Sequence, residues 1–320
     1  AAFGASISRD GFKITRSCPG PAGLVADNDV VCHAPKRLTA TGYGDLIEKI
    51  PAGADWILAD ELGIEPIDQG SWDLAQGRLE AAISDPQGLV DRDPNAFVAL
   101  AEGLVLSGLA MQRYRISSRP ASGAGHLFSH VWEMEHLGMD QDPPLTHGFK
   151  VGLGTLATLA LWQNAVDLDV AAIDTEAVVA AWRSREDTEA SVRSWFTGNM
   201  VEPAVKQTLD KYLTADQLPE RIGLIKSAWP TITARAREQL IPPERAESIR
   251  RVPPSAADRP ESSAFPGHLS ALSHDPQPLH PARRVVRARR ARGAGRQALR
   301  PRRVLGPEAL GAGRLIAGRP

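Results

Sequence analysis

The feature that most constrains the fold is a long apolar segment near the middle of the chain. Residues 94–115 are largely apolar, and the most apolar run, Ala96 to Met111, is interrupted by Glu102. A membrane span needs about 20 predominantly apolar residues, so this segment suits a buried helix better. We therefore expect a long helix here that lies at the centre of a hydrophobic core.

Helical patterns follow one another from Pro35 onward. A helix is expected over 38–50, with Thr39 or Thr41 as its N-cap, and another from the cap Asp174 through Trp182. The other expected helices cover 71–83, 125–137, 147–163, a segment through Trp195, 205–212 and 219–229. Apolar and polar residues alternate on both sides of Asp10-Gly11, which predicts a β-hairpin, and residues 23–32 are expected to form another short strand. The fold class is mainly α, with a helical domain over 35–250 after a short β remnant over 1–34.

The C-terminal part differs in charge and composition. Residues 227–320 contain 18 Arg, no Lys and 7 acidic residues, a balance of +11, which leaves −12 on residues 1–226. An acidic body argues against a main domain that binds nucleic acid. Residues 251–320 have no Trp or Tyr, and we expect a disordered tail. One alternative is that these residues form a basic arm that binds nucleic acid. The favoured explanation of their composition is an out-of-frame translation of GC-rich DNA.

Cysteine usage and the N-terminus indicate a compartment. The two cysteines, Cys18 and Cys32, are too few for a disulfide framework. The chain also lacks the Cys-x-x-Cys pair that a zinc ribbon would need. Free thiols are typical of a reducing compartment. The first residues show no signal peptide, and the lack of an initial Met suggests a fragment. We expect a soluble, cytoplasmic protein.

Acidic and imidazole side chains stand beside glycines at a few places in the helical body. His126 and His130 are four residues apart in SGAGHLFSH, so both would project from one face near a helix N-terminus. Asp45 lies in TGYGDL, and His147 lies in THGFKVG. One carboxylate and two imidazoles are a good ligand set for Zn²⁺ or Fe²⁺, and three protein ligands leave a coordination position open for a substrate.

Each of these residues also has an interpretation without a metal. Two histidines at this spacing are more often packed or on the surface than ligands. Asp45 alone would be an ordinary acid in the first turn of a helix, where the helix dipole favours it. His147 would be an N-terminal helix residue with no ligand role.

Three stretches carry a resemblance to a known family: ADNDVVCHAPKRLTATGYGDLIEKI, SSRPASGAGHLFSHVWEM and HGFKVGLGTL. With them, roughly residues 5–250 resemble the sn-glycerol-1-phosphate dehydrogenases, of the iron-containing alcohol dehydrogenase and dehydroquinate synthase-like superfamily. The resemblance implies the C-terminal helical metal-binding domain of that fold, after a remnant of its α/β nucleotide-binding domain. It also implies reduction of dihydroxyacetone phosphate to sn-glycerol 1-phosphate with NADH or NADPH and a bound Zn²⁺, with Fe²⁺ or Ni²⁺ as alternatives.

The resemblance assigns roles to the same residues. It implies that Asp45, His126 and His147 bind the metal. It implies that Asp45 also lies beside the substrate and that His130 contacts it, both as catalytic residues. The metal would polarise the ketone, and His130 would orient the substrate or pass a proton, or else only hydrogen-bond a ligand.

Residues just before the histidine pair are candidates for the substrate phosphate. Ser118, Arg119 and Ser122 precede the predicted site, and an Arg suits bidentate phosphate contact. The alternative for Arg119 is that it caps the carboxyl end of a helix. The expected partners are therefore a small phosphorylated triose or polyol and, for the chain itself, a homodimer, with no nucleic acid and no membrane span.

Two departures from the family pattern bear on function. No glycine-rich phosphate turn after a strand occurs, so the chain resembles an N-terminally truncated member. Gly125 stands where a Glu usually precedes the first metal His, which would loosen the support of that ligand. Three alternatives stay open: an inactive metal-binding fragment; a sister glycerol dehydrogenase, alcohol dehydrogenase or dehydroquinate synthase-like enzyme; and a non-catalytic helical binding protein with a basic arm.

Overall fold

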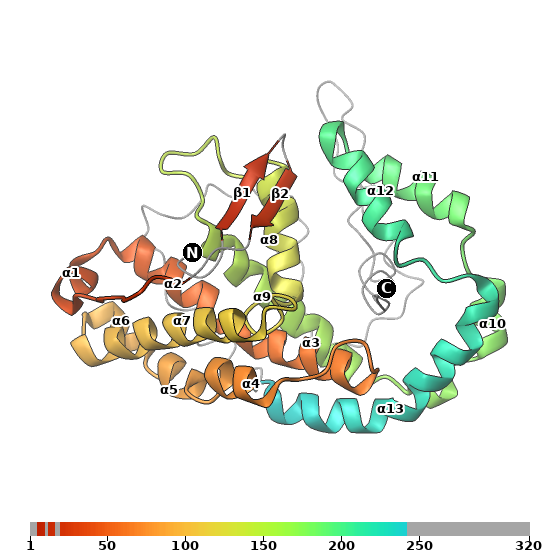
Figure 1. Cartoon of the computed structure of the whole chain (residues 1–320), viewed down its shortest axis with the longest axis horizontal. Coiled ribbons are helices and arrows are strands. Elements are labelled where there is room, and N and C mark those ends of the chain that lie inside the picture. The colour runs from red at the N-terminus through yellow and green to blue at the C-terminus, as the bar shows by residue number, and fades with distance from the viewer. Residues whose placement is uncertain (1–4, 10–11, 17–19, 242–320) are drawn as a thin grey trace, which may run out of the picture. The chain divides into compact units, whose positions relative to one another are not determined.

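The computed structural model describes residues 5–9, 12–16 and 20–241. Within these ranges the chain is mainly α-helical, as its sequence predicts (Figure 1). The strand β1 (Ala5–Arg9) pairs antiparallel with β2 (Phe12–Arg16), and Arg9 lies opposite Phe12. The two strands of the predicted hairpin are confirmed. Its turn, Asp10-Gly11, and the predicted tail over 251–320 lie outside the described residues.

The strand expected over residues 23–32 is wrong. The structure has a short helix there, α1 (Asn28–His33), whose N-cap Asp27 accepts a hydrogen bond from the Val30 N–H at 3.2 Å. Val30 is exposed and only Cys32 of this helix is buried, so the apolar residues of this segment do not form a buried strand face. The Asp27 carboxylate stabilises the start of this helix as its N-cap, although the helix buries little apolar surface.

The helix α2 (Lys36–Ile47) begins earlier than its sequence suggests. Neither Thr39 nor Thr41 is its cap, because the helix starts directly after Pro35. Thr41 lies inside the helix and its hydroxyl donates to the Arg37 carbonyl at 2.8 Å. A threonine inside a helix commonly bonds the preceding turn in this way.

A second helix, α3 (Lys49–Glu61), follows α2 almost without a break, and the sequence patterns do not predict it as a separate element. Pro51 and Gly53 are residues that usually interrupt helices. In the structure Pro51 lies in the first turn, where its missing N–H costs no helical hydrogen bond. Trp56 is 1% exposed, so the helix is held mainly by burial.

The helix predicted over 71–83 is two helices. The segment consists of α4 (Gln69–Gln76) and α5 (Leu79–Ile83), which break at Gly77. A further short helix, α6 (Pro86–Asp91), precedes the long apolar segment.

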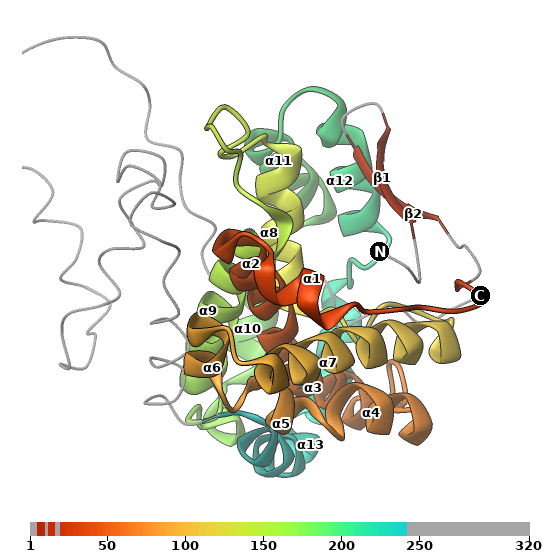
Figure 2. The same cartoon turned by 90° about the vertical axis from the view of Figure 1, so that its left-hand side faces the viewer.

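The long apolar helix is confirmed as α7 (Pro94–Tyr114), and it packs against α1, α2, α4, α5 and α6 (Figure 2). Phe97 and Leu100 are buried in the core, whereas Glu102 pairs with Arg78 at 2.8 Å on the surface. Among the described helices, α7 alone is long and apolar enough to span a membrane. One face of α7 is therefore buried against its neighbours, whereas Val98 and Leu109 on this helix are exposed.

The second half of the described chain is also helical. It contains α8 (Ala124–Met134), α9 (His147–Ala165), η1 (Val170–Ala172), α10 (Thr175–Ala180), α11 (Arg185–Trp195), η2 (Gly198–Met200), α12 (Val201–Leu209), η3 (Ala215–Gln217) and α13 (Leu218–Gln239). The predicted cap Asp174 is confirmed, since it accepts from the Glu176 and Ala177 N–H groups at 3.0 and 3.2 Å. The helix that it starts ends before Trp182. α13 packs along α3.

Glycines allow α9 to pack closely against both α2 and α8. A Cβ atom on Gly148 would collide with the Thr41 carbonyl oxygen, and one on Gly44 would lie 2.5 Å from the Gly148 carbonyl oxygen. On the other side, a Cβ on Gly154 would collide with the Gly125 carbonyl. Because only glycine permits backbones to approach this closely, these residues bring three helices together where the candidate ligands lie.

Candidate metal centre

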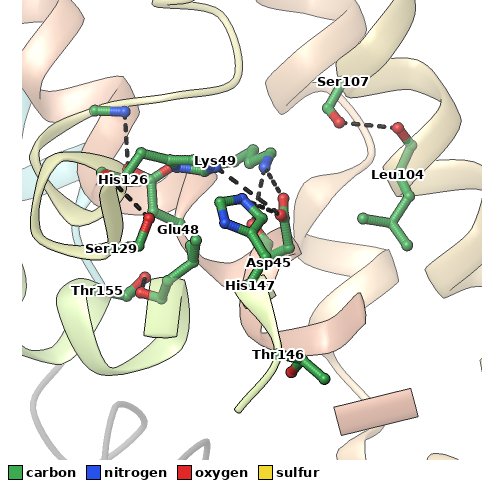
Figure 3. A network of polar contacts seen from close by, with 12 residues as sticks. Asp45, Glu48, Lys49, Leu104, Ser107, His126, Ser129, Thr146, His147 and Thr155 are labelled. Carbon is green, nitrogen blue, oxygen red and sulfur yellow. Dashed lines mark hydrogen bonds and ion pairs between the residues drawn. The ribbon is translucent and has the colours of Figure 1, made fainter. Parts of the chain in front are cut away.

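Three potential metal ligands from three helices meet at one point (Figure 3). Asp45 lies on α2, His126 lies in the first turn of α8, and His147 is the first residue of α9. One ligand atom from each lies within 4.8 Å of the others. Asp45 Oδ2 is 3.6 Å from His147 Nε2 and 3.9 Å from His126 Nε2. The structure therefore brings together the three residues that the sequence selects as ligands.

This donor set fits an ion of the size of zinc. Ligand atoms at about 2.0–2.1 Å from a tetrahedral Zn²⁺ are about 3.4 Å from one another. The separations of 3.6 and 3.9 Å are close to this value, and all three ligand atoms lie within 4.8 Å of one another. Imidazole nitrogens with a carboxylate oxygen suit zinc, and they also suit divalent iron and nickel.

Lys49 fixes the orientation of Asp45. Its Nζ donates to Asp45 Oδ1 at 2.6 Å and to the Asp45 carbonyl oxygen at 2.8 Å, and its side chain is only 2% exposed. Burial alone would raise the pKa of Asp45, but the Lys49 ammonium and the imidazoles of His126 and His147 hold that pKa well below its ordinary value. Asp45 is therefore ionised, and Oδ2 is the oxygen that faces the histidines.

Each candidate imidazole has a carboxylate near its other nitrogen. His147 Nδ1 lies 2.6 Å from Glu133 Oε1, and His126 Nδ1 lies 3.1 Å from Glu48 Oε2. A carboxylate that accepts from Nδ1–H holds the ring proton there and leaves the Nε2 lone pair for a metal. Only His147 makes such a hydrogen bond, with Glu133. In both histidines Nε2 is the nitrogen that points toward Asp45.

The N-terminus of α8 is also held by carboxylates. Its N-cap, Gly123, has no side chain, but its backbone N–H donates to Glu48 Oε1 at 2.8 Å. The next N–H group, of Ala124, donates to Asp55 Oδ2 at 2.7 Å. A negative charge at a helix N-terminus is favourable. These two amides, which a glycine-rich loop can offer to a phosphate, are therefore already paired.

His130 lies beside the candidate ligands. Its ring centroid is 6.0 Å from that of His126 and 6.2 Å from that of His147, and it is nearly parallel to the His147 ring, with an angle of 22°. The i, i+4 spacing thus places His126 and His130 on the same side of α8. The substrate contact proposed for His130 stays a prediction.

The residues expected at the substrate phosphate have other contacts. Arg119 Nε donates to Glu65 Oε2 at 2.8 Å, and the Arg119 backbone N–H donates to the Ser117 hydroxyl at 3.1 Å. None of the described contacts joins Arg119, Ser118 or Ser122 to the three candidate ligands. Phosphate binding by Arg119 and Ser122 stays a prediction, and Arg119 Nε is already paired.

Sequence reasoning missed three charged residues of the centre. Lys49 follows Asp45 by four residues, a spacing that joins side chains on a helix, so this signal was available. Glu133 lies on α8, seven residues after His126, and meets His147 across the turn to α9. Glu48 had no such signal, because only tertiary packing brings it to His126.

Glycerol-1-phosphate dehydrogenases are among the curated proteins to which the chain is similar, although no model of a known protein family matches the sequence. The chain is 36% identical over 162 residues to a glycerol-1-phosphate dehydrogenase (NAD(P)+) of Halalkalibacterium halodurans. It is 37% identical over 149 residues to the protein of that name in Bacillus subtilis, and 33% identical over 164 residues to that in Methanosphaera stadtmanae.

The matches cover about half of this chain: 51%, 47% and 50%, respectively. They cover 40%, 37% and 45% of the three relatives, so the chain spans less than half of each relative's length. Three sequence motifs predicted similarity to glycerol-1-phosphate dehydrogenases, and these matches confirm it. By their names, these relatives are dehydrogenases that use NAD(P).

Proposed function

We propose that this chain carries the metal- and substrate-binding site of an NAD(P)H-dependent glycerol-1-phosphate dehydrogenase. The reaction would be the reduction of dihydroxyacetone phosphate to sn-glycerol 1-phosphate. The observation that carries the proposal is the meeting of Asp45, His126 and His147, with carboxylates behind both imidazoles, in a chain similar to enzymes of that name.

The residues of the centre have distinct tasks in this proposal. Zn²⁺, or Fe²⁺ or Ni²⁺ in its place, would be held by Asp45 Oδ2 and by Nε2 of His126 and His147. When bound, such an ion supplies Lewis-acid polarisation of a ketone oxygen. Lys49 keeps Asp45 ionised and turned toward the histidines. His130 lies close enough to both imidazoles to hydrogen-bond a substrate hydroxyl or to hold a proton.

The hydride would come from the nicotinamide, whose chemistry belongs to the cofactor. The described residues contain no strand followed by a glycine-rich turn and a helix, so nothing in them assigns the cofactor site. One alternative is therefore a chain that binds metal without turning over substrate. A sister polyol or alcohol dehydrogenase, or a dehydroquinate synthase-like enzyme, is the other. A cytoplasmic location, a role in lipid biosynthesis and a homodimer belong to the same proposal.

The test is to measure bound metal and turnover in the same preparation. We expect the purified chain to hold close to one equivalent of zinc. His126→Ala and His147→Ala should lose it, whereas His136→Ala should keep it, because His136 is exposed and is not among the candidate ligands. Oxidation of NADH or NADPH would be followed with dihydroxyacetone phosphate as substrate.

The outcomes separate the alternatives. Zinc-dependent oxidation of NAD(P)H with dihydroxyacetone phosphate supports the dehydrogenase. Zinc binding with no turnover and no change in NADH fluorescence favours the metal-binding chain without activity. Zinc retained in both His126→Ala and His147→Ala would rule out the ligand set.

A further inference from the structure

A fully buried carboxylate lies behind one of the candidate ligands. Glu48, at the junction of α2 and α3, is 0% exposed. Its Oε1 accepts the Gly123 N–H at 2.8 Å, which leaves Oε2 without a hydrogen bond. His126 Nδ1 lies 3.1 Å from Oε2, and this nitrogen is also buried and without a hydrogen bond (Figure 3).

These two atoms complement each other. A buried carboxylate oxygen and a buried ring nitrogen are each costly without a partner. Their separation already lies in the range of an N–H···O hydrogen bond, and only the angle between the groups departs from one. A rotation of the imidazole that turns Nδ1–H toward Oε2 would satisfy both atoms and would leave Nε2 of His126 unprotonated.

Gly125 leaves the space that this carboxylate fills. A Cβ atom on Gly125 would lie 2.8 Å from Glu48 Cγ and 3.3 Å from Glu48 Oε1. It would also lie 3.1 Å from the backbone nitrogen of Thr155. A side chain at position 125 would therefore push Glu48 away from His126, since the α9 backbone bounds the other side.

We infer that Glu48 is the positioning residue for the metal ligand His126, and that Gly125 is required because Glu48 occupies the space beside it. Glu48 would accept the Nδ1–H of His126 with one oxygen and hold the start of α8 with the other. This inference rests on the proposed metal site and adds to it the group that orients one of its ligands.

Asp55 provides a matched control on the same helix end. Like Glu48, it caps the N-terminus of α8, through the Ala124 N–H at 2.7 Å, and its other oxygen accepts the Trp162 indole N–H at 2.8 Å. Neither of these two contacts is with a histidine. A variant of Asp55 therefore tests the loss of a capping charge, whereas a variant of Glu48 also tests the contact with His126.

The first experiment compares Glu48→Gln with Asp55→Asn. The glutamine amide oxygen can still accept the Gly123 N–H, but its NH₂ group would face His126 Nδ1 and favour the tautomer with the proton on Nε2. We expect zinc affinity, measured by competition with a chelator, to fall about 10- to 100-fold in Glu48→Gln and to change less than about threefold in Asp55→Asn. The visible absorption of the Co²⁺-loaded chain should change only in Glu48→Gln.

The second experiment tests the role of Gly125. Gly125→Ala should weaken zinc binding in the otherwise unchanged chain. In a Glu48→Ala background it should have little further effect, because the group that it displaces is gone. Equal losses in both backgrounds would overturn the assignment. Thermal unfolding of the metal-free variants shows which of them are folded.

The proposed metal site and the proposed role of Glu48 can be tested separately. If the unchanged chain binds no zinc, the proposed metal site fails and this inference fails with it. If the unchanged chain and Glu48→Gln bind zinc equally and give the same Co²⁺ spectrum, the metal site stands and only the role of Glu48 is overturned.

Discussion

Two Asp–Lys pairs in this chain have the same length and opposite surroundings. Lys49 Nζ lies 2.6 Å from Asp45 Oδ1 at the centre, and Lys206 Nζ lies 2.6 Å from Asp210 Oδ2 at the end of α12, each pair four residues apart. The side chains of Lys49 and Asp45 are 2% and 27% exposed, and those of Lys206 and Asp210 are 75% and 56% exposed.

The two pairs differ in their exposure to water, and this exposure determines how strongly the lysine affects the aspartate. Water screens the pair on α12, and such surface pairs contribute little to stability. At the centre the pair is largely withdrawn from water, so the ammonium decides the charge and the direction of the carboxylate. The distance between two charged atoms is therefore a poor guide to a site, whereas burial and the direction of the remaining oxygen are better ones.

The largest effect is expected from breaking the buried pair. Lys49→Met removes the ammonium and leaves Asp45 without its partner in a mostly dry place. We expect the free energy of unfolding of the metal-free chain to fall by about 2–3 kcal/mol, measured by urea denaturation. Lys206→Met, the matched control, should change it by less than about 0.5 kcal/mol. Similar losses of unfolding free energy in both variants would contradict the expected difference between the buried and the exposed pair.

A second prediction concerns the close packing that assembles the centre. Gly148→Ala places a Cβ against the Thr41 carbonyl, so α2 and α9 must separate. We expect a loss of about 2 kcal/mol in unfolding free energy and weaker zinc binding. Gly223→Ala is the control, because a Cβ there meets nothing within 4 Å and alanine is the better helix former. A stabilising Gly148→Ala would show that the close approach is not needed.

The smallest effect is expected at an exposed carboxylate. Hydrogen bonds from Ser71 and Arg113 lower the pKa of Asp68, the N-cap of α4, to about 2. Because the folded-state pKa lies below the ordinary value, this contribution is present above about pH 4 and is lost as the pH falls toward 2. Asp68→Asn keeps a capping oxygen and removes the charge. Its unfolding midpoint should be slightly below that of the unchanged chain at pH 7 and should converge with it near pH 2.

A gap between the two midpoints that stays constant from pH 7 to pH 2 would contradict the assigned pKa. The same series on Lys49→Met would not isolate one group in this way, because the His126 and His147 imidazoles also face Asp45.

Much of the helical framework could be predicted from sequence because local signals agree there. The apolar period of α7, the cap Asp174 and the ends of α9 follow from side chains close in sequence. The strand expected over 23–32 was wrong: the apolar residues there are mostly exposed, and a helix capped by Asp27 begins at Asn28 instead.

The candidate ligands could also be selected from sequence, as imidazoles and a carboxylate beside glycines. Their supports could not. Glu48 acts on His126 across 78 positions of sequence, and its approach depends on the missing side chain of Gly125. Such a contact is set by the packing of helices, and a single sequence carries no local sign of it.

In the proposed centre, Asp45, His126 and His147 hold one metal ion together. X-ray absorption at the zinc edge of the zinc-loaded chain tests it most directly. We expect only nitrogen and oxygen neighbours at about 2.0–2.1 Å, with the outer-shell scattering of two imidazoles. A sulfur neighbour at about 2.3 Å, or outer-shell scattering from fewer than two imidazoles, would contradict it.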